Sequence, residues 1–201
     1  MTARVDHTVT SGTFSLDGET FDVDNNVWVV GDDTECVVID APHAIAPIVE
    51  LVGGRKVTAV LCTHGHDDHV RFAPELGREV GAPVLLHPAD APVWSLTHDT
   101  PPDAELSDGQ EFEVGGTVLR VIHTPGHAPG AVCFYAPELG TVFTGDTLFN
   151  GGPGATGRSF SDGDLIVTSI RERLLVLPDD TVVRTGHGDD TTIGDERDNV
   201  G

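Results

Sequence analysis

The stretch Thr63–His69, which reads THGHDDH, decides how this sequence is interpreted. It directly follows Val57–Cys62 (VTAVLC), a continuous apolar run that is typical of a strand buried on both faces. Its H-x-H-x-D-H pattern supplies four polar side chains within six residues: His64, His66, Asp68 and His69. Imidazole nitrogens and carboxylate oxygens are ligands of zinc and similar divalent ions. Because the four ligands are so close together, the pattern predicts two neighbouring ions, one near His64 and His66 and one near Asp68 and His69.

Three other segments repeat this arrangement, in which a strand end leads into a glycine-rich loop with one polar side chain. TPGHAPG (124–130) offers His127, TGD (144–146) offers Asp146, and TGHG (185–188) offers His187. Each of these residues alone would be ordinary in a turn. Together with the first stretch they make a set of five histidines and two aspartates, which suffices for two metal ions with open coordination positions.

The charge balance argues against two classes of partner. The chain of 201 residues carries 33 acidic and 11 basic side chains, which gives a net charge of −22. Nucleic-acid backbones and anionic membranes both attract a basic surface, so neither is expected as a partner. The chain also lacks an apolar stretch of about 18 residues that could span a membrane, and its start lacks the pattern of a secretory signal. Its three cysteines form no close pair, which suits a reducing compartment, and we expect a cytoplasmic protein.

Short apolar runs separated by Gly, Pro and Asp predict strands, and helical periodicity predicts helices between them. We expect strands at 26–31, 35–40, 57–62, 83–87, 117–122, 131–135, 141–144 and 181–185, the first two joined as a hairpin. We expect helices at 43–52, 69–80 and 164–177, the last capped by Asp162 or Asp164. This order favours the α+β class, with two sheets and the helices outside them. It also indicates a single domain over residues 1–201, in which residues 194–201 form a frayed tail.

The four motifs, in this order and spacing, are similar to those of the metallo-β-lactamase-fold hydrolases. The resemblance is greatest to the glyoxalase II-like (hydroxyacylglutathione hydrolase-like) branch, and it extends over roughly residues 20–193. It implies an αβ/βα sandwich of two mixed β-sheets flanked by helices, with the metals at one edge between the sheets. By the same resemblance, Asp40 would contact the metal ligands without binding a metal ion itself.

The resemblance also implies a role for each ligand. His64, His66 and His127 would hold the first metal, and Asp68, His69 and His187 the second. Asp146 would bridge the two ions together with a water or hydroxide, which makes Asp68 and Asp146 the catalytic carboxylates. True β-lactamases of this fold generally have Cys or Ser where the bridging carboxylate stands, so antibiotic hydrolysis is not expected.

The implied reaction is hydrolysis of a thioester by attack of a metal-bound hydroxide. Two dications, expected to be Zn²⁺ with iron or manganese as alternatives, lower the pKa of bound water from 15.7 to about 7 or below and polarise the carbonyl. A thiolate, whose conjugate acid has a pKa of about 8.5, departs without a strong general acid, unlike an amine. The sequence offers no obvious extra acid, which favours a thioester over an amide.

The sequence of the loop after Asp146 suggests which side chains contact the substrate. Glyoxalase II enzymes place basic and aromatic side chains there, and Arg158 and Phe160 are similar to that pair. Arg158 would bind a carboxylate of the thiol. Those enzymes also continue into a helical C-terminal region, whereas only 14 residues follow His187 here. The expected partner is therefore the thioester of a small thiol, which need not be glutathione, and the chain could form a homo-oligomer.

Three other functions stay open at this point. A persulfide dioxygenase would use a single iron, with His64, His127 and Asp146 as ligands. Lactonases of the same fold share all seven ligands. Metal binding without catalysis is the least favoured alternative, since every ligand position is intact. The metal content of the protein distinguishes the first of these from a hydrolase.

Overall fold

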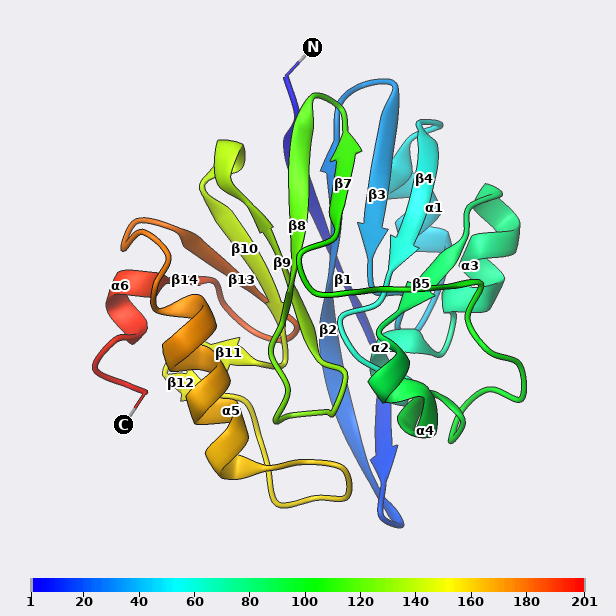
Figure 1. Ribbon diagram of the computed structural model, residues 1–201. Coiled ribbons are helices and arrows are strands. Elements are labelled where there is room, and N and C mark those ends of the chain that lie inside the picture. Colours follow the sequence, from blue (N-terminus) through cyan, green and yellow to red (C-terminus); the bar gives the residue numbers. More distant parts are fainter. Residues whose placement is uncertain (1, 201) are drawn as a thin grey trace.

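Two six-stranded sheets face each other, and helices cover their outer faces (Figure 1). The structure is a computed structural model that describes residues 2–200. It confirms the αβ/βα sandwich and the mixed character of both sheets. Across the described residues, no helix is long and apolar enough to cross a membrane.

The first sheet has the order β1-β2-β3-β4-β5-β6. The strands are β1 Arg4–Leu16, β2 Glu19–Gly31, β3 Glu35–Ile39, β4 Lys56–Leu61, β5 Val84–Leu86 and β6 Ala104–Glu105. The pairs β1–β2 and β2–β3 are antiparallel, and β3 to β6 are parallel. The parallel steps cross over through helices, so the carboxyl ends of β3, β4 and β5 lie at one edge of the sheet.

The second sheet has the order β14-β13-β10-β9-β8-β7. The strands are β7 Glu111–Val114, β8 Thr117–His123, β9 Val132–Ala136, β10 Thr141–Gly145, β13 Val182–Thr185 and β14 Thr191–Thr192. β10 and β13 are parallel, and the other pairs are antiparallel. A small separate pair, β11 Leu148–Phe149 and β12 Gly152–Pro153, follows β10.

Helices pack on both outer faces. They are α1 Ala46–Val52, α2 Asp67–Val70, α3 Ala73–Val80, α4 Ala91–Trp94, α5 Gly163–Ser169 and α6 Ile193–Glu196.

Apolar side chains alternate between the layers because successive strand residues point to opposite faces. In β3, Val37 and Ile39 face the second sheet, whereas Cys36 and Val38 face the layer that contains α1 and α3. The predicted two-sided burial of the strand before THGHDDH is confirmed, since Val60 and Leu61 in β4 are both fully buried.

The first strand was missed by the sequence prediction. β1 forms a long hairpin with β2 through Asp17 and Gly18, whose positive φ angles of 54° and 78° suit a tight hairpin turn. Most β1 side chains are exposed or half-buried, so the strand has little apolar signal. Figure 1 shows this hairpin reaching past the rest of the first sheet, toward the loop before α5.

Two predicted helices are interrupted. Helix 69–80 is divided into α2, which begins earlier at Asp67, and α3, which restarts after Phe72 with Pro74 in its first turn. Proline fits a first helical turn but not a helix interior, which explains the division. The predicted helix 164–177 is α5 followed by a π-helical segment, Ile170–Leu174. Its cap is Asp162, whose side chain accepts hydrogen bonds from the backbone N–H groups of residues 164 and 165.

The predicted frayed tail is instead packed against the second sheet. Val200 is buried in the same apolar cluster as Leu174 and Ile193. Glu196 is also buried, and it accepts hydrogen bonds from the Gly151 N–H and from a threonine hydroxyl. These anchors hold the segment although its composition is polar; residue 201 lies outside the described residues.

Charged side chains form ion pairs over much of the surface. Eight arginines within residues 2–200 pair with an aspartate or glutamate: Arg4, Arg55, Arg71, Arg120, Arg158, Arg173, Arg184 and Arg197. The chain has 11 basic and 33 acidic side chains, so most of the carboxylates have no cationic partner.

Candidate metal centre

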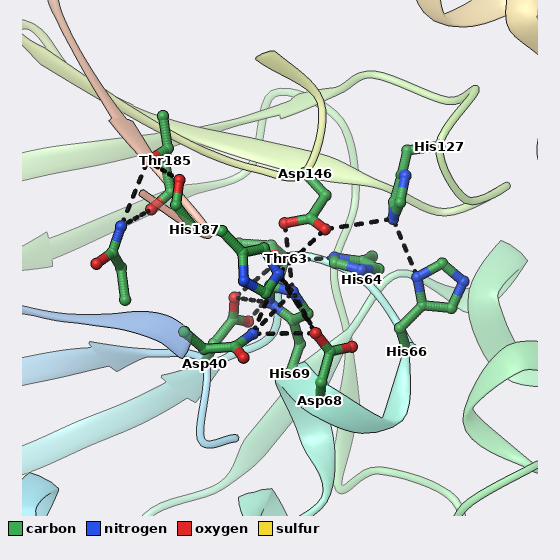
Figure 2. Close-up of polar contacts among 12 residues, drawn as sticks. Asp40, Thr63, His64, His66, Asp68, His69, His127, Asp146, Thr185 and His187 are labelled. Atoms are coloured by element: carbon green, nitrogen blue, oxygen red, sulfur yellow. Dashed lines mark hydrogen bonds and ion pairs between the residues drawn. The ribbon is translucent and has the colours of Figure 1, made fainter. Parts of the chain in front are cut away.

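The residues predicted as metal ligands come together at one edge of the sandwich, between the two sheets. His64 and His66 lie in the loop after β4, and Asp68 and His69 lie in α2. The other three follow strands of the second sheet: His127 lies between β8 and β9, Asp146 after β10 and His187 after β13. Strand ends that meet at one edge therefore bring together side chains from four separate stretches of sequence (Figure 2).

His64, His66 and His127 form the first group, which we call the histidine trio. One ring nitrogen of each lies within 4.8 Å of the others, and all three side chains are buried. The Nδ1–H of His127 can donate to the Ala155 carbonyl at 2.8 Å, which leaves its Nε2 lone pair toward the centre. The Nε2 atoms of His64 and His66 are buried without a hydrogen-bond partner. Buried polar atoms normally have partners, so the unpartnered Nε2 of His64 fits a metal ligand. His66 instead turns its Nδ1 toward the trio, 3.0 Å from His127 Nε2.

Asp68, His69 and His187 form the second group, here the mixed trio. The His69 Nδ1 lies 2.8 Å from Asp40 Oδ2, and the His187 Nδ1 lies 2.8 Å from the Asp24 carbonyl oxygen. Each contact orients a ring so that Nε2 faces the centre, which is the usual way in which metal-binding histidines are held. The two Nε2 atoms are 3.3 Å apart, and both lie near Asp68 Oδ2.

Asp146 lies between the two trios. Its Oδ2 is 3.6 Å from His127 Nε2 and 3.4 Å from His187 Nε2, and its Oδ1 is 3.3 Å from His69 Nε2. Figure 2 shows the carboxylate between His127 on one side and His187 on the other. This position suits a carboxylate that is shared by two ions.

Burial and charge divide the histidines into two kinds. Burial, with the neighbouring histidines, holds the pKa of His64 well below its usual range and lowers that of His66 to about 3. Both rings are therefore neutral at pH 7, as metal binding requires. Burial also opposes charge on His187, but the adjacent Asp146 carboxylate outweighs it and raises the pKa of His187 to about 10. The Asp68 and Asp146 carboxylates thus favour positive charge at the mixed trio, which either protons or divalent cations can supply.

Asp40 connects the mixed trio to the loop after β4. Its Oδ1 accepts a hydrogen bond from the Thr63 N–H at 2.8 Å, and its Oδ2 accepts one from the Thr63 hydroxyl at 2.8 Å and contacts the His69 ring. Its φ of 62° is unusual for a residue other than glycine, and these contacts hold it there. Asp40 therefore lies where the family resemblance placed it.

The sequence prediction missed Asn25, a buried residue of β2 that touches the mixed trio. Its Nδ2 donates to Asp68 Oδ2 at 3.2 Å and lies 3.2–3.3 Å from the Nε2 atoms of His69 and His187. The His43 Nε2 lies 2.7 Å from Asn25 Oδ1, an arrangement in which the ring donates and fixes the amide orientation. Neither residue belongs to a motif, and an asparagine in a strand gives no local sign of such a contact.

A cavity of about 150 Å³ opens over the centre. Five predicted ligands form its floor: His66, Asp68, His127, Asp146 and His187. Phe14, Leu16 and Val23 of the β1–β2 hairpin line one wall, and residues 155–161 contribute Ala155, Arg158, Ser159 and Ser161. The walls are mostly apolar, as is usual for pockets that bind small organic molecules.

The two predicted substrate contacts lie in different surroundings. Arg158 lines the cavity, but its guanidinium pairs with Glu19 at 2.7 Å and lies 4.7 Å from the centre of the Phe21 ring. Phe160 has a φ of 70° and is 41% exposed, and the described lining of the cavity does not include it. The structure therefore brings Arg158 to the site and leaves Phe160 at the surface beside it.

The chain belongs to the metallo-beta-lactamase superfamily, whose family model matches residues 20–187. Members of this superfamily are metal-dependent hydrolases or related enzymes.

Among individual proteins, the chain is 36% identical to an uncharacterized protein of Mycobacterium leprae, with 86% of this chain and 90% of that one covered. It is 35% identical to the hydroxyacylglutathione hydrolase GloC of Haemophilus influenzae, with 85% and 87% covered.

Two solved structures are similar over most of their length. The B3 metallo-beta-lactamase BLEG-1 has a TM-score of 0.78 at 28% identity and covers 94% of this chain and 97% of its own. TTHA1623, solved in a di-iron-bound form, has a TM-score of 0.76 at 34% identity, with 87% and 92% covered.

Proposed function

We propose that this protein hydrolyses the thioester of a small thiol with two divalent cations, Zn²⁺ in the first instance. The observation that carries the proposal is the convergence of seven buried or half-buried ligands into two trios with Asp146 between them. The similarity to a hydroxyacylglutathione hydrolase supports the same reaction class.

The ligands divide between two ions. His64, His66 and His127 would hold one, Asp68, His69 and His187 the other, and Asp146 would touch both. Bound there, the cations would supply Lewis acidity toward a carbonyl oxygen and a lowered pKa for water. The protein supplies neutral imidazoles, the contacts of Asp40 and Asp24 that aim two rings, and a cavity whose apolar walls exclude bulk water.

The cavity also favours a particular leaving group. Among its lining residues, the titratable side chains are predicted ligands, apart from Arg158. Arginine stays protonated at neutral pH and does not act as a general acid. A leaving group must therefore depart without a proton from the wall, which a thiolate does and an amine does not. This argument favours a thioester over an amide or a β-lactam.

The deciding experiment combines metal analysis with three substrates. Protein purified without added metal is analysed for zinc, iron and manganese, then assayed with S-lactoylglutathione, with a chromogenic β-lactam and with glutathione persulfide under oxygen monitoring. We expect two zinc ions per chain and turnover of the thioester only.

A different result identifies an alternative. The di-iron form of TTHA1623 is a specific reason to consider iron. One iron per chain with oxygen consumption would replace the hydrolase by a persulfide dioxygenase. A lactone is assayed as a fourth substrate, and its turnover without turnover of the thioester would replace the hydrolase by a lactonase.

A further inference from the structure

A buried carboxylate links the two loops that carry the histidine trio. Asp90 ends a short helical turn, Pro88–Asp90, that follows β5, and its side chain is fully buried. Its Oδ2 accepts a hydrogen bond from the Gly65 N–H at 2.7 Å, and its Oδ1 accepts one from the Gly130 N–H at 2.5 Å. Gly65 lies between His64 and His66, and Gly130 lies three residues after His127.

The backbone approaches Asp90 closely at both contacts. A Cβ atom on Gly130 would lie 2.7 Å from the Asp90 nitrogen and 2.9 Å from its Cβ. A Cβ atom on Gly65 would lie 3.0 Å from the Trp94 nitrogen and 3.2 Å from the Asp90 carbonyl oxygen. Neither glycine has a positive φ, so the space around Asp90, and not backbone conformation, is the reason for glycine at these positions.

The mixed trio is held by other groups. Asp40 contacts His69, the Asp24 carbonyl contacts His187, and Asn25 contacts Asp68. The Asp90 carboxylate bonds to neither Asp40 nor Asn25, and its two hydrogen bonds go to the loops of the histidine trio.

We propose that Asp90 is a positioning residue for the first metal site, where it fixes the loop of His64 and His66 against the loop of His127. The inference rests on the two-metal site of the proposed function. It requires a carboxylate, because the two oxygens accept from two separate N–H groups. An asparagine of the same shape has one oxygen and one NH₂ group, and its NH₂ would face an N–H donor.

The test measures Zn²⁺ affinity by competition with a chromophoric chelator, with the full chain in two backgrounds. His187→Ala weakens the mixed trio and isolates the first site, whereas His127→Ala isolates the second. In the His187→Ala background, we expect Asp90→Asn to weaken Zn²⁺ binding by about 10- to 100-fold, the usual effect of losing a group that orients ligands. In the His127→Ala background, we expect no change.

Two further variants make the test specific. Gly130→Ala moves the same contact by steric pressure and should weaken the first site in the same way as Asp90→Asn. Asn25→Ala is the matched control: the Asn25 amide contacts Asp68, His69 and His187 and no residue of the histidine trio, so its loss should weaken the second site and leave the first unchanged. Circular dichroism of each variant without metal shows whether the fold is retained, and Gly130→Ala provides the measurement if Asp90→Asn does not fold.

The outcomes separate this inference from the proposed function. Equal weakening of both sites, or of neither, overturns the positioning role of Asp90 while the two-metal site stands. A wild-type protein that binds fewer than two ions overturns both.

Discussion

Arg158 and Glu19 provide a test of how the site selects its substrate. Arg158 is the one arginine or lysine in the described lining of the cavity, and its guanidinium forms an ion pair with Glu19 at 2.7 Å. A substrate that carries a carboxylate would have to exchange with Glu19. We therefore expect Arg158→Ala to raise KM for an anionic thioester, and Glu19→Gln to lower it.

The magnitudes follow from the exposure of the pair. A hydrogen bond between charged groups contributes about 1.5–3 kcal/mol. In the ion pair between Arg158 and Glu19, the two side chains are 33% and 62% exposed, so the pair contributes about 0.2–1 kcal/mol. A substrate carboxylate that binds Arg158 must first break this pair. The difference, roughly 0.5–2.8 kcal/mol, predicts that Arg158→Ala raises KM about 2- to 100-fold. Glu19→Gln removes the competitor and should lower KM by about 1.4- to 5-fold.

The assay compares S-lactoylglutathione with the neutral S-lactoyl-N-acetylcysteamine at equal metal content. Both substitutions should change KM for the anionic thioester, with little effect on kcat, and leave the neutral one unchanged. In the Arg158→Ala background, Glu19→Gln should have no effect. The reasoning is refuted if Glu19→Gln changes both substrates equally, or if Arg158→Ala has wild-type kinetics with the anionic thioester.

Three other substitutions test the centre and its supports. Asp146→Asn should cost at least one metal ion and nearly all hydrolysis, because a neutral amide does not balance two neighbouring dications; two ions at full affinity in metal analysis would contradict the bridging role. Asp162→Ala removes the cap of α5 and should lower the free energy of unfolding by about 1 kcal/mol in urea titrations, whereas an unchanged midpoint would show that the cap is dispensable. Burial raises the pKa of Asp90 from 3.8 to about 6. Between these two pH values the folded chain keeps the Asp90 proton, whereas the unfolded chain has released it. We compare the free energy of unfolding of the metal-depleted wild type with that of metal-depleted Asp90→Asn. The difference should favour the wild type most below pH 3.8 and fall by on the order of 3 kcal/mol as pH rises to 6 and above. A difference that does not vary from pH 4 to 7 would contradict this.

The sequence predicted the parts of the site that are local in the chain. The spacing of His64, His66, Asp68 and His69 places four predicted ligands on one loop and the helix after it, so no long-range information was needed. The other three candidate ligands were proposed because each follows a strand end in a glycine-rich loop. The assignment of all seven to two ions rested on the family resemblance, and in the structure their side chains lie in two neighbouring groups with Asp146 between them.

The contacts that hold the ligands were not predictable in the same way. Asp90 bonds to Gly65 and Gly130, which are 25 and 40 residues away in the chain. An aspartate is common in this acidic sequence, and only the assembled fold distinguishes this one. The hairpin strand β1 was missed because its side chains are largely exposed, although its Asp17-Gly18 turn was a usable signal.

The surplus of carboxylates over basic side chains predicts that concentrated salt stabilises this fold. With a net charge of −22 and most acidic side chains unpaired, the folded surface repels itself. Electrostatic repulsion reaches about 10 Å at 0.1 M salt but only about 3 Å at 1 M. The melting temperature should accordingly rise as KCl is increased from 0.1 to 2 M, and a melting temperature independent of KCl would refute this. The same screening weakens the attraction between the partly exposed Arg158 guanidinium and an anionic substrate. At high salt, substrate binding should therefore depend more on the apolar wall of Phe14, Leu16 and Val23.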